Sequence, residues 1–113
     1  MDMRIERHGE KAVVVVSGAL NAAVVDGFRE QVHAWMKANE KVTQYVIDVS
    51  AMDFIDSAGL GVLIALLKRV TERGGDIRIA GLLAKARVVF EITRAFKIFE
   101  IYETVEEALR AES

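Results

Sequence analysis

Four consecutive valines at positions 13–16 constrain the fold of this chain more than any other feature. A β-branched run without polar alternation predicts a strand that is covered on both faces, as in the parallel sheets of α/β proteins. This strand spans residues 11–17, and a short turn at residues 8–10 separates it from a weaker strand candidate at residues 3–7. Because the turn is so short, we expect the two strands to form an antiparallel hairpin.

Helical and strand patterns alternate over the rest of the chain. Helices are predicted after Asn21, from residues 54–60 to a glycine stop at residues 74–75, over residues 83–93, and after a capping Thr104. Strands are predicted at residues 42–49 and 76–80, with a polar turn at residues 50–53 and a brief edge strand within residues 96–102. Strands joined by right-handed helical crossovers are parallel. We therefore expect an α/β fold with about four helices and a mixed four- to five-stranded sheet, in which the first strand is antiparallel to the second and the rest are mainly parallel.

The composition bounds the class of protein. The chain has 113 residues, 52% of them hydrophobic, and contains no cysteine. This length predicts one domain over residues 1–113. The charged start resembles no signal peptide, and the apolar runs are too short to span a bilayer, so we expect a cytoplasmic protein without membrane insertion. A formal net charge of −2, with basic residues interleaved among acids, argues against a nucleic-acid binder.

Two loops are expected to meet at one edge of the sheet. In parallel sheets, ligands and partners gather at the carboxyl ends of the strands. Asn21 and Ser57 both follow such ends, and Asn21 is also a candidate N-cap of the first helix. The sequence therefore predicts one functional edge built from these two segments.

The helix that starts near Ser57 has an unusually smooth beginning. At about 100° per residue, its larger apolar side chains fall on one side, which is expected to pack on the sheet; they are Leu60, Leu63, Ile64, Leu67 and Val70. The opposite side carries Ala58, Gly61, Val62, Ala65 and Arg69. Gly59 and Gly61 each cost roughly 0.5–1 kcal/mol relative to alanine in a helix. Two interpretations stay open: a surface that another protein's backbone approaches, or tight packing inside the domain.

Catalytic motifs are not found. His8 and His33 have no metal-ligand spacing, so we predict no metal site and no cofactor. The run from Asp56 to Gly59 lacks the glycine that a serine nucleophile needs two positions earlier, where Ile55 stands. We therefore expect a protein that is not an enzyme, and we keep a small serine hydrolase only as a remote alternative.

Two further interpretations of Ser57 stay open: an ordinary hydroxyl at a helix start, or a phosphorylation site. A phosphate at a helix N-terminus meets free N–H groups and the positive end of the helix dipole, an effect of about 0.3–1 kcal/mol. The same dianion in a closed interface must be desolvated, which costs several kcal/mol per ion. One phosphate would therefore abolish binding and leave the fold intact.

The stretches from Val46 to Ser50 and from Phe54 to Leu63 resemble the signature of the STAS domain family, the anti-sigma factor antagonists. The similarity extends over nearly the whole chain and implies a STAS-like fold. It also implies a protein that binds an anti-sigma factor, itself a serine kinase, while the serine matching Ser57 is unphosphorylated. The kinase then modifies Ser57, and a serine phosphatase resets it.

The resemblance implies that partner binding uses residues on both loops. These residues are Asn21, Asp56, Ser57, Ala58, Gly59, Leu60, Gly61 and Val62. A homodimer is left open. The family often has Asp where this chain has Asn21, which bears on kinase or partner specificity. An alternative role is a STAS scaffold or accessory subunit, stressosome-like or bound to an ABC transporter, that needs no serine phosphorylation.

Overall fold

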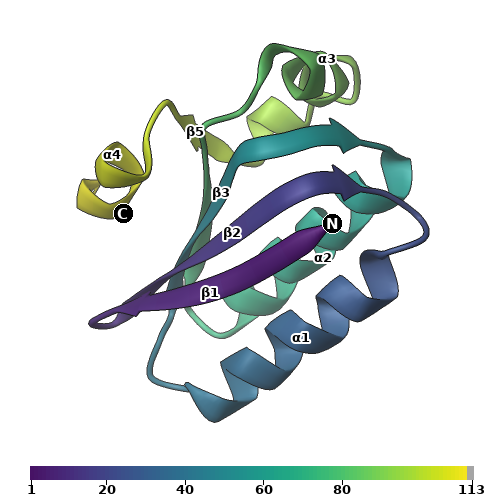
Figure 1. Ribbon diagram of the computed structural model, residues 1–113. Helices are drawn as coiled ribbons and strands as arrows, with labels where there is room; N and C mark the ends of the chain where they lie inside the picture. Colours follow the sequence, from purple (N-terminus) through teal and green to yellow (C-terminus); the bar gives the residue numbers. More distant parts are fainter. Residues whose placement is uncertain (112–113) are drawn as a thin grey trace.

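Five strands form one mixed sheet in the order β1-β2-β3-β4-β5 (Figure 1). The computed structural model describes residues 1–111. β1 is antiparallel to β2, whereas the β2–β3, β3–β4 and β4–β5 pairs are parallel. The strands are β1 Asp2–His8, β2 Lys11–Leu20, β3 Gln44–Ile55, β4 Asp76–Ala80 and β5 Glu100–Tyr102. The helices are α1 Val25–Ala38, α2 Ser57–Glu72, α3 Ala84–Ile92 and α4 Val105–Arg110, with a 3₁₀ turn, η1, at Ala95–Lys97. The predicted fold class is confirmed.

The valine run is covered on both faces, as predicted, although Val15 is only half-buried. Val14 and Val16 belong to the main core, which α1, α2 and α3 complete. Val13 belongs to a second, smaller cluster on the other face, where it packs with Ala108 of α4. Figure 1 shows α1 and α2 side by side under the sheet and α4 on the opposite face.

β2 and β3 are longer than the sequence indicated. The predicted polar turn at residues 50–53 is wrong, because β3 runs straight through it and pairs with β2 as far as Leu20 and Ile55. Two register shifts interrupt this pairing, and Gly18 adopts a positive φ of 83° beside one of them. Such irregularities bend a strand and break its two-residue alternation. Two exposed residues therefore separate the buried Met52 from the buried Ile55, whereas a regular strand has one exposed residue between buried ones.

The ends of the later helices follow the predicted capping residues. Gly74 has a φ of 80°, and the N–H of Gly75 donates to the carbonyl of Val70, which closes the last turn of α2. Thr104 Oγ1 accepts the N–H of Glu107 at 3.1 Å and caps α4. These stops fix the length of α2 and the start of α4.

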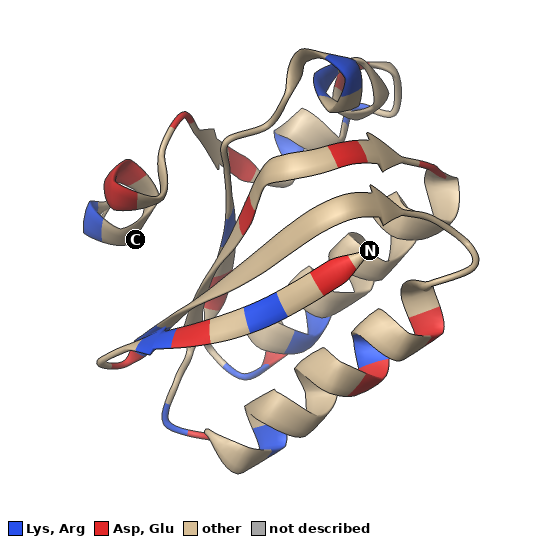
Figure 2. Ribbon diagram, viewed as in Figure 1, with Lys and Arg blue, Asp and Glu red and all other residues tan. Residues whose placement is uncertain are grey.

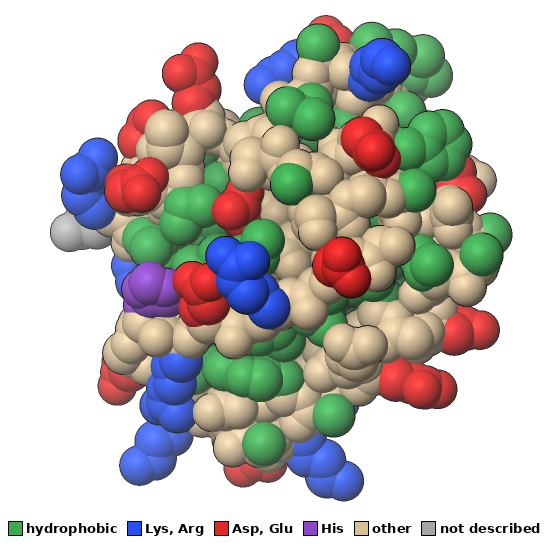
Figure 3. Space-filling model, viewed as in Figure 1, with side chains coloured by type: hydrophobic (Ala, Val, Ile, Leu, Met, Phe, Trp, Pro, Cys, Tyr) green, Lys and Arg blue, Asp and Glu red, His purple; other side chains and the backbone are tan. Residues whose placement is uncertain are grey.

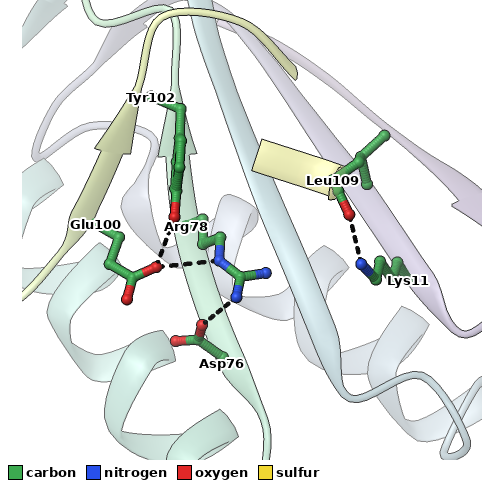
Figure 4. A network of polar contacts seen from close by, with 6 residues as sticks. All are labelled: Lys11, Asp76, Arg78, Glu100, Tyr102 and Leu109. Atoms are coloured by element: carbon green, nitrogen blue, oxygen red, sulfur yellow. Dashed lines mark hydrogen bonds and ion pairs between the residues drawn. The ribbon is translucent and has the colours of Figure 1, made fainter. Parts of the chain in front are cut away.

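A buried arginine ties β4 to β5 (Figure 4). The side chain of Arg78 is 2% exposed, and its Nε lies 3.2 Å from Glu100 Oε1 while its Nη2 lies 3.5 Å from Asp76 Oδ2. The Tyr102 hydroxyl donates to the same Glu100 oxygen at 2.8 Å. These two donors, the tyrosine first, lower the pKa of Glu100. The short β5 is thus held by a charged network as well as by its backbone pairing.

Candidate functional site

Asp56 joins the two loops at the carboxyl edge of the sheet. It is the N-cap of α2, where its Oδ1 accepts the N–H of Gly59 at 2.8 Å. Its other oxygen accepts the N–H of Ala22, in the loop after β2, at 3.0 Å. Its own N–H donates to the carbonyl of Leu20 at 3.4 Å. The prediction that the segments following β2 and β3 lie together is confirmed.

The same hydrogen bonds keep Asp56 charged. The N–H of Gly59 is the largest influence that lowers its pKa, and the N–H groups of Ala22 and Ala58 act in the same direction. Because these donors favour the carboxylate over the neutral acid, the edge carries a fixed negative charge at neutral pH.

Asn21 does not cap α1, contrary to the prediction. Its side-chain oxygen accepts the N–H of Ala23 at 3.0 Å, and its carbonyl accepts those of Val24 and Val25. These bonds form a separate turn, so the helix starts only at Val25 and its N-cap position, Val24, has no side-chain cap. Asn21 shapes the loop that Asp56 holds.

Ser57 is the first residue of α2 and is exposed. Gly61, one turn later, is also exposed, and Ala58 is half-buried. The remaining residues of the predicted binding set, Gly59, Leu60 and Val62, are buried. The accessible part of the predicted surface is therefore limited to the loop at Asn21, the cap Asp56 and the outer side of the first helical turns.

The buried face of α2 is rotated from the predicted one. Val62 was expected on the open side but is 2% exposed, whereas Ile64 and Leu67 are only half-buried. The prediction placed the sheet under the largest apolar side chains. The helix instead approaches the sheet closely at Gly59, where a Cβ atom would lie 2.1 Å from the carbonyl oxygen of Leu20.

The two glycines of α2 differ in their surroundings: Gly59 is packed against the sheet and Gly61 faces open space. Gly59 permits tight packing of the helix on β2, because any side chain there would collide with backbone. A Cβ atom at Gly61 would meet nothing within 4 Å. Gly61 therefore serves no internal packing and leaves the outer helix surface smooth.

Exposed apolar side chains extend this edge, and they were not among the residues predicted from the sequence. Phe54 is 52% exposed at the end of β3. Leu83 is 41% exposed where α3 follows β4. Figure 3 shows hydrophobic side chains gathered over α3 and toward the end of β3. The other exposed apolar side chains are Val88, Ile92, Phe96 and Ile98. We call these four residues, together with Phe54 and Leu83, the apolar band. The spacing of Val88 and Ile92, four apart and outside the buried face of α3, is the signal that could have revealed it.

The charged residues around this apolar band are mainly basic. Lys85 and Arg87 lie on α3, and Arg94 and Lys97 lie beside it, whereas Glu91 is the one acid among residues 83–98 (Figure 2). All five are exposed.

Neither a metal-binding cluster nor a membrane-spanning helix is found in the described part of the chain. Residues 1–111 contain no group of His, Cys, Asp and Glu side chains placed to hold a metal ion. Partial burial, followed by the charges of Arg69 and Arg29, lowers the pKa of His33. No helix within the same residues is long and apolar enough to cross a membrane.

Comparisons with known proteins agree on one family. The family model described as STAS domain matches residues 2–108. An anti-sigma F factor antagonist from Paenibacillus polymyxa is 26% identical over 111 residues, which are 96% of this chain and 94% of that protein. The crystal structure of an anti-sigma factor antagonist from Mycobacterium paratuberculosis superposes with a TM-score of 0.85 at 25% identity, covering 96% of this chain and 90% of the other. The structure of the Bacillus cell fate determinant SpoIIAA in its phosphorylated form has the same fold, with a TM-score of 0.74 at 20% identity and 96% coverage of both chains.

Proposed function

This chain belongs to the STAS domain family and is related to anti-sigma factor antagonists, and on that premise we propose that it binds an anti-sigma factor through the edge around Ser57 and is released by phosphorylation of that serine. The partner in this proposal is also the serine kinase, and a serine phosphatase restores the binding form. The single observation that carries the proposal is the exposed Ser57 at the start of α2, beside a cap that links both loops.

The local charge supports a phosphate-operated switch. Asp56 is ionised and already accepts the N–H of Gly59, so a phosphate on Ser57 would stand beside a carboxylate rather than replace it. Phosphorylation adds about −1.5 to −2 charges at neutral pH. In the free protein, water solvates this charge. In a closed interface the phosphate must lose that water, at a cost of several kcal/mol, and about 1.4 kcal/mol is already a tenfold change in affinity.

The apolar band supports the choice of a protein partner. Phe54 lies two residues before Asp56, and Leu83 follows the neighbouring strand at the same end of the sheet. Groups of exposed apolar side chains mark interaction sites in soluble domains. In this proposal the partner covers the edge around Ser57 and the near end of the band, and bears acidic groups opposite Lys85 and Arg87.

The phosphorylation step is tested with a candidate serine kinase, taken from a neighbouring gene, and ATP. Mass spectrometry of the digested protein is expected to find one phosphate on the peptide that contains Ser57. The Ser57→Ala variant, which keeps the fold and removes the hydroxyl, serves as the control and is expected to stay unmodified. Tight kinase binding without any modification of Ser57 would instead favour the scaffold role.

A further inference from the structure

The outer edge of β1 carries unpaired backbone groups. β1 is the terminal strand of the sheet and pairs only with β2 among the described residues. Its side chains alternate between two faces. Met3 and Ile5 lie against the main core beside α1, whereas Arg4 and Glu6 lie opposite Val15 and Val13 on the other face.

The turn between β1 and β2 determines which backbone groups face outward. His8 pairs with Lys11 across the two-residue turn, so this pair closes the hairpin with hydrogen bonds. Hydrogen-bonded and non-hydrogen-bonded pairs then alternate along an antiparallel ladder. The N–H and C=O groups of Met3, Ile5 and Arg7 consequently point away from β2 and form a free edge.

We propose that β1 pairs antiparallel with β1 of a second copy of this chain, with a two-fold axis at Ile5, and joins two five-stranded sheets into one. In this register Ile5 faces Ile5 and Met3 faces Arg7, and both pairs use outward-pointing backbone groups. On the other face, Arg4 stands opposite Glu6 of the second copy and Asp2 stands opposite its His8. The interface is isologous, as two-fold dimers require.

Charge complementarity selects this register. Opposite charges directly across a strand pair are favourable by roughly 0.2–1 kcal/mol, and like charges are unfavourable. An axis at Arg4 or Glu6 would need backbone groups that already bind β2. An axis at Arg7 would place Arg7 against itself, and an axis at Met3 would leave residues 6–8 without a partner. Only the axis at Ile5 pairs the full length of β1 without a like-charge contact.

A groove beside β1 accepts the second copy. It lies between β1 and α1, and its lining residues are Met3, Arg4, Ile5, Gln31, Ala34 and Trp35. Gln31 and Ala34 are exposed, and Ile5 and Trp35 are half-buried. Pairing across the axis at Ile5 would bring the two copies of this groove together and cover these side chains. Within one copy Arg4 Nε lies 2.7 Å from Glu6 Oε2, and the two side chains are 68% and 44% exposed, so this ion pair remains accessible to the same pair of a second copy.

The pairing surface shares no residue with the edge around Ser57. It therefore does not depend on the proposed function, and variants on one surface report on that surface alone.

A charge exchange between Arg4 and Glu6 tests the proposal. Sedimentation analysis over a dilution series at low salt is expected to show a dimer of the wild-type chain. Arg4→Glu alone or Glu6→Arg alone places like charges opposite each other twice per dimer, and either is expected to weaken dimerisation roughly tenfold. The double variant Arg4→Glu with Glu6→Arg restores opposite charges and is expected to return the wild-type dissociation constant.

The control is Lys68→Glu, which reverses an exposed charge on α2 and is expected to leave dimerisation unchanged. Circular dichroism verifies that each variant is folded. A monomeric wild-type chain throughout the series would overturn the proposal, and so would a dimer that the single variants do not weaken. A double variant no better than the single variants would exclude this register.

Discussion

At the scale of single residues, Gly59 and Asp56 build the candidate site. Gly59 lets α2 approach the carbonyl of Leu20, and Asp56 then reaches both the first turn of α2 and the loop after β2. Ser57 is placed at the surface by these two neighbours. Phosphorylation of Ser57 stays a prediction from the sequence. The bridge from Asp56 to Ala22 was not predicted, because no local pattern reports a hydrogen bond between residues 34 apart.

The two glycines of α2 give a matched test of this geometry. Gly59→Ala forces a methyl group into the backbone of β2 and is expected to destabilise the fold by about 1–3 kcal/mol or more. Gly61→Ala meets open space and is expected to stabilise the fold by roughly 0.5–1 kcal/mol through helix propensity. Urea denaturation of both variants measures the difference. Equal effects of the two substitutions would contradict the close approach at Gly59.

The charge on Asp56 has a pH signature. Its folded pKa lies below the ordinary value of 3.8, so its contribution to stability is complete above that pH and disappears as the pH falls through the folded pKa. Asp56→Asn is therefore expected to be less stable than wild type at pH 7 and to approach wild type in acid. Unfolding free energies measured from pH 7 to pH 2 give this comparison, and a constant difference at all pH values would refute the assigned role.

At the scale of elements, sequence patterns identified nearly every strand and helix but not their irregular parts. Three local features were sufficient to place their elements, because each depends only on neighbouring residues: the valine run in β2, the glycine stop after α2 and the Thr104 cap of α4. The extension of β3 depends on register shifts against β2. The orientation of α2 depends on Gly59, which lies against the carbonyl of Leu20 in β2. Both are set by contacts distant in sequence, which periodicity does not record.

The cap of α4 gives a test at this scale. Thr104→Ala removes the oxygen that accepts the N–H of Glu107 and is expected to cost about 1 kcal/mol of folding stability. Thr104→Ser keeps the oxygen and is expected to stay close to wild type. Thermal or urea unfolding distinguishes them, and an alanine variant as stable as wild type would show that the cap is dispensable.

At the scale of the whole molecule, the proposed function and the proposed dimer use different edges of one sheet. The carboxyl edge carries Ser57, the fixed charge of Asp56 and the near end of the apolar band. The outer edge of β1 carries a self-complementary row of charges. A partner bound at the first edge therefore leaves the second free, so dimerisation and partner binding are expected to be independent.

The central claim is that negative charge at Ser57 prevents partner binding without unfolding the chain. Isothermal titration of the purified anti-sigma factor kinase with wild type, Ser57→Asp and Ala65→Asp tests it most directly, because Ala65 is exposed on the same helix, roughly 12 Å further along its axis. Ser57→Asp is expected to melt like wild type and to bind at least about tenfold more weakly, a loss of roughly 1.4 kcal/mol, whereas Ala65→Asp is expected to bind like wild type. Equal affinities of wild type and a folded Ser57→Asp variant would contradict the account.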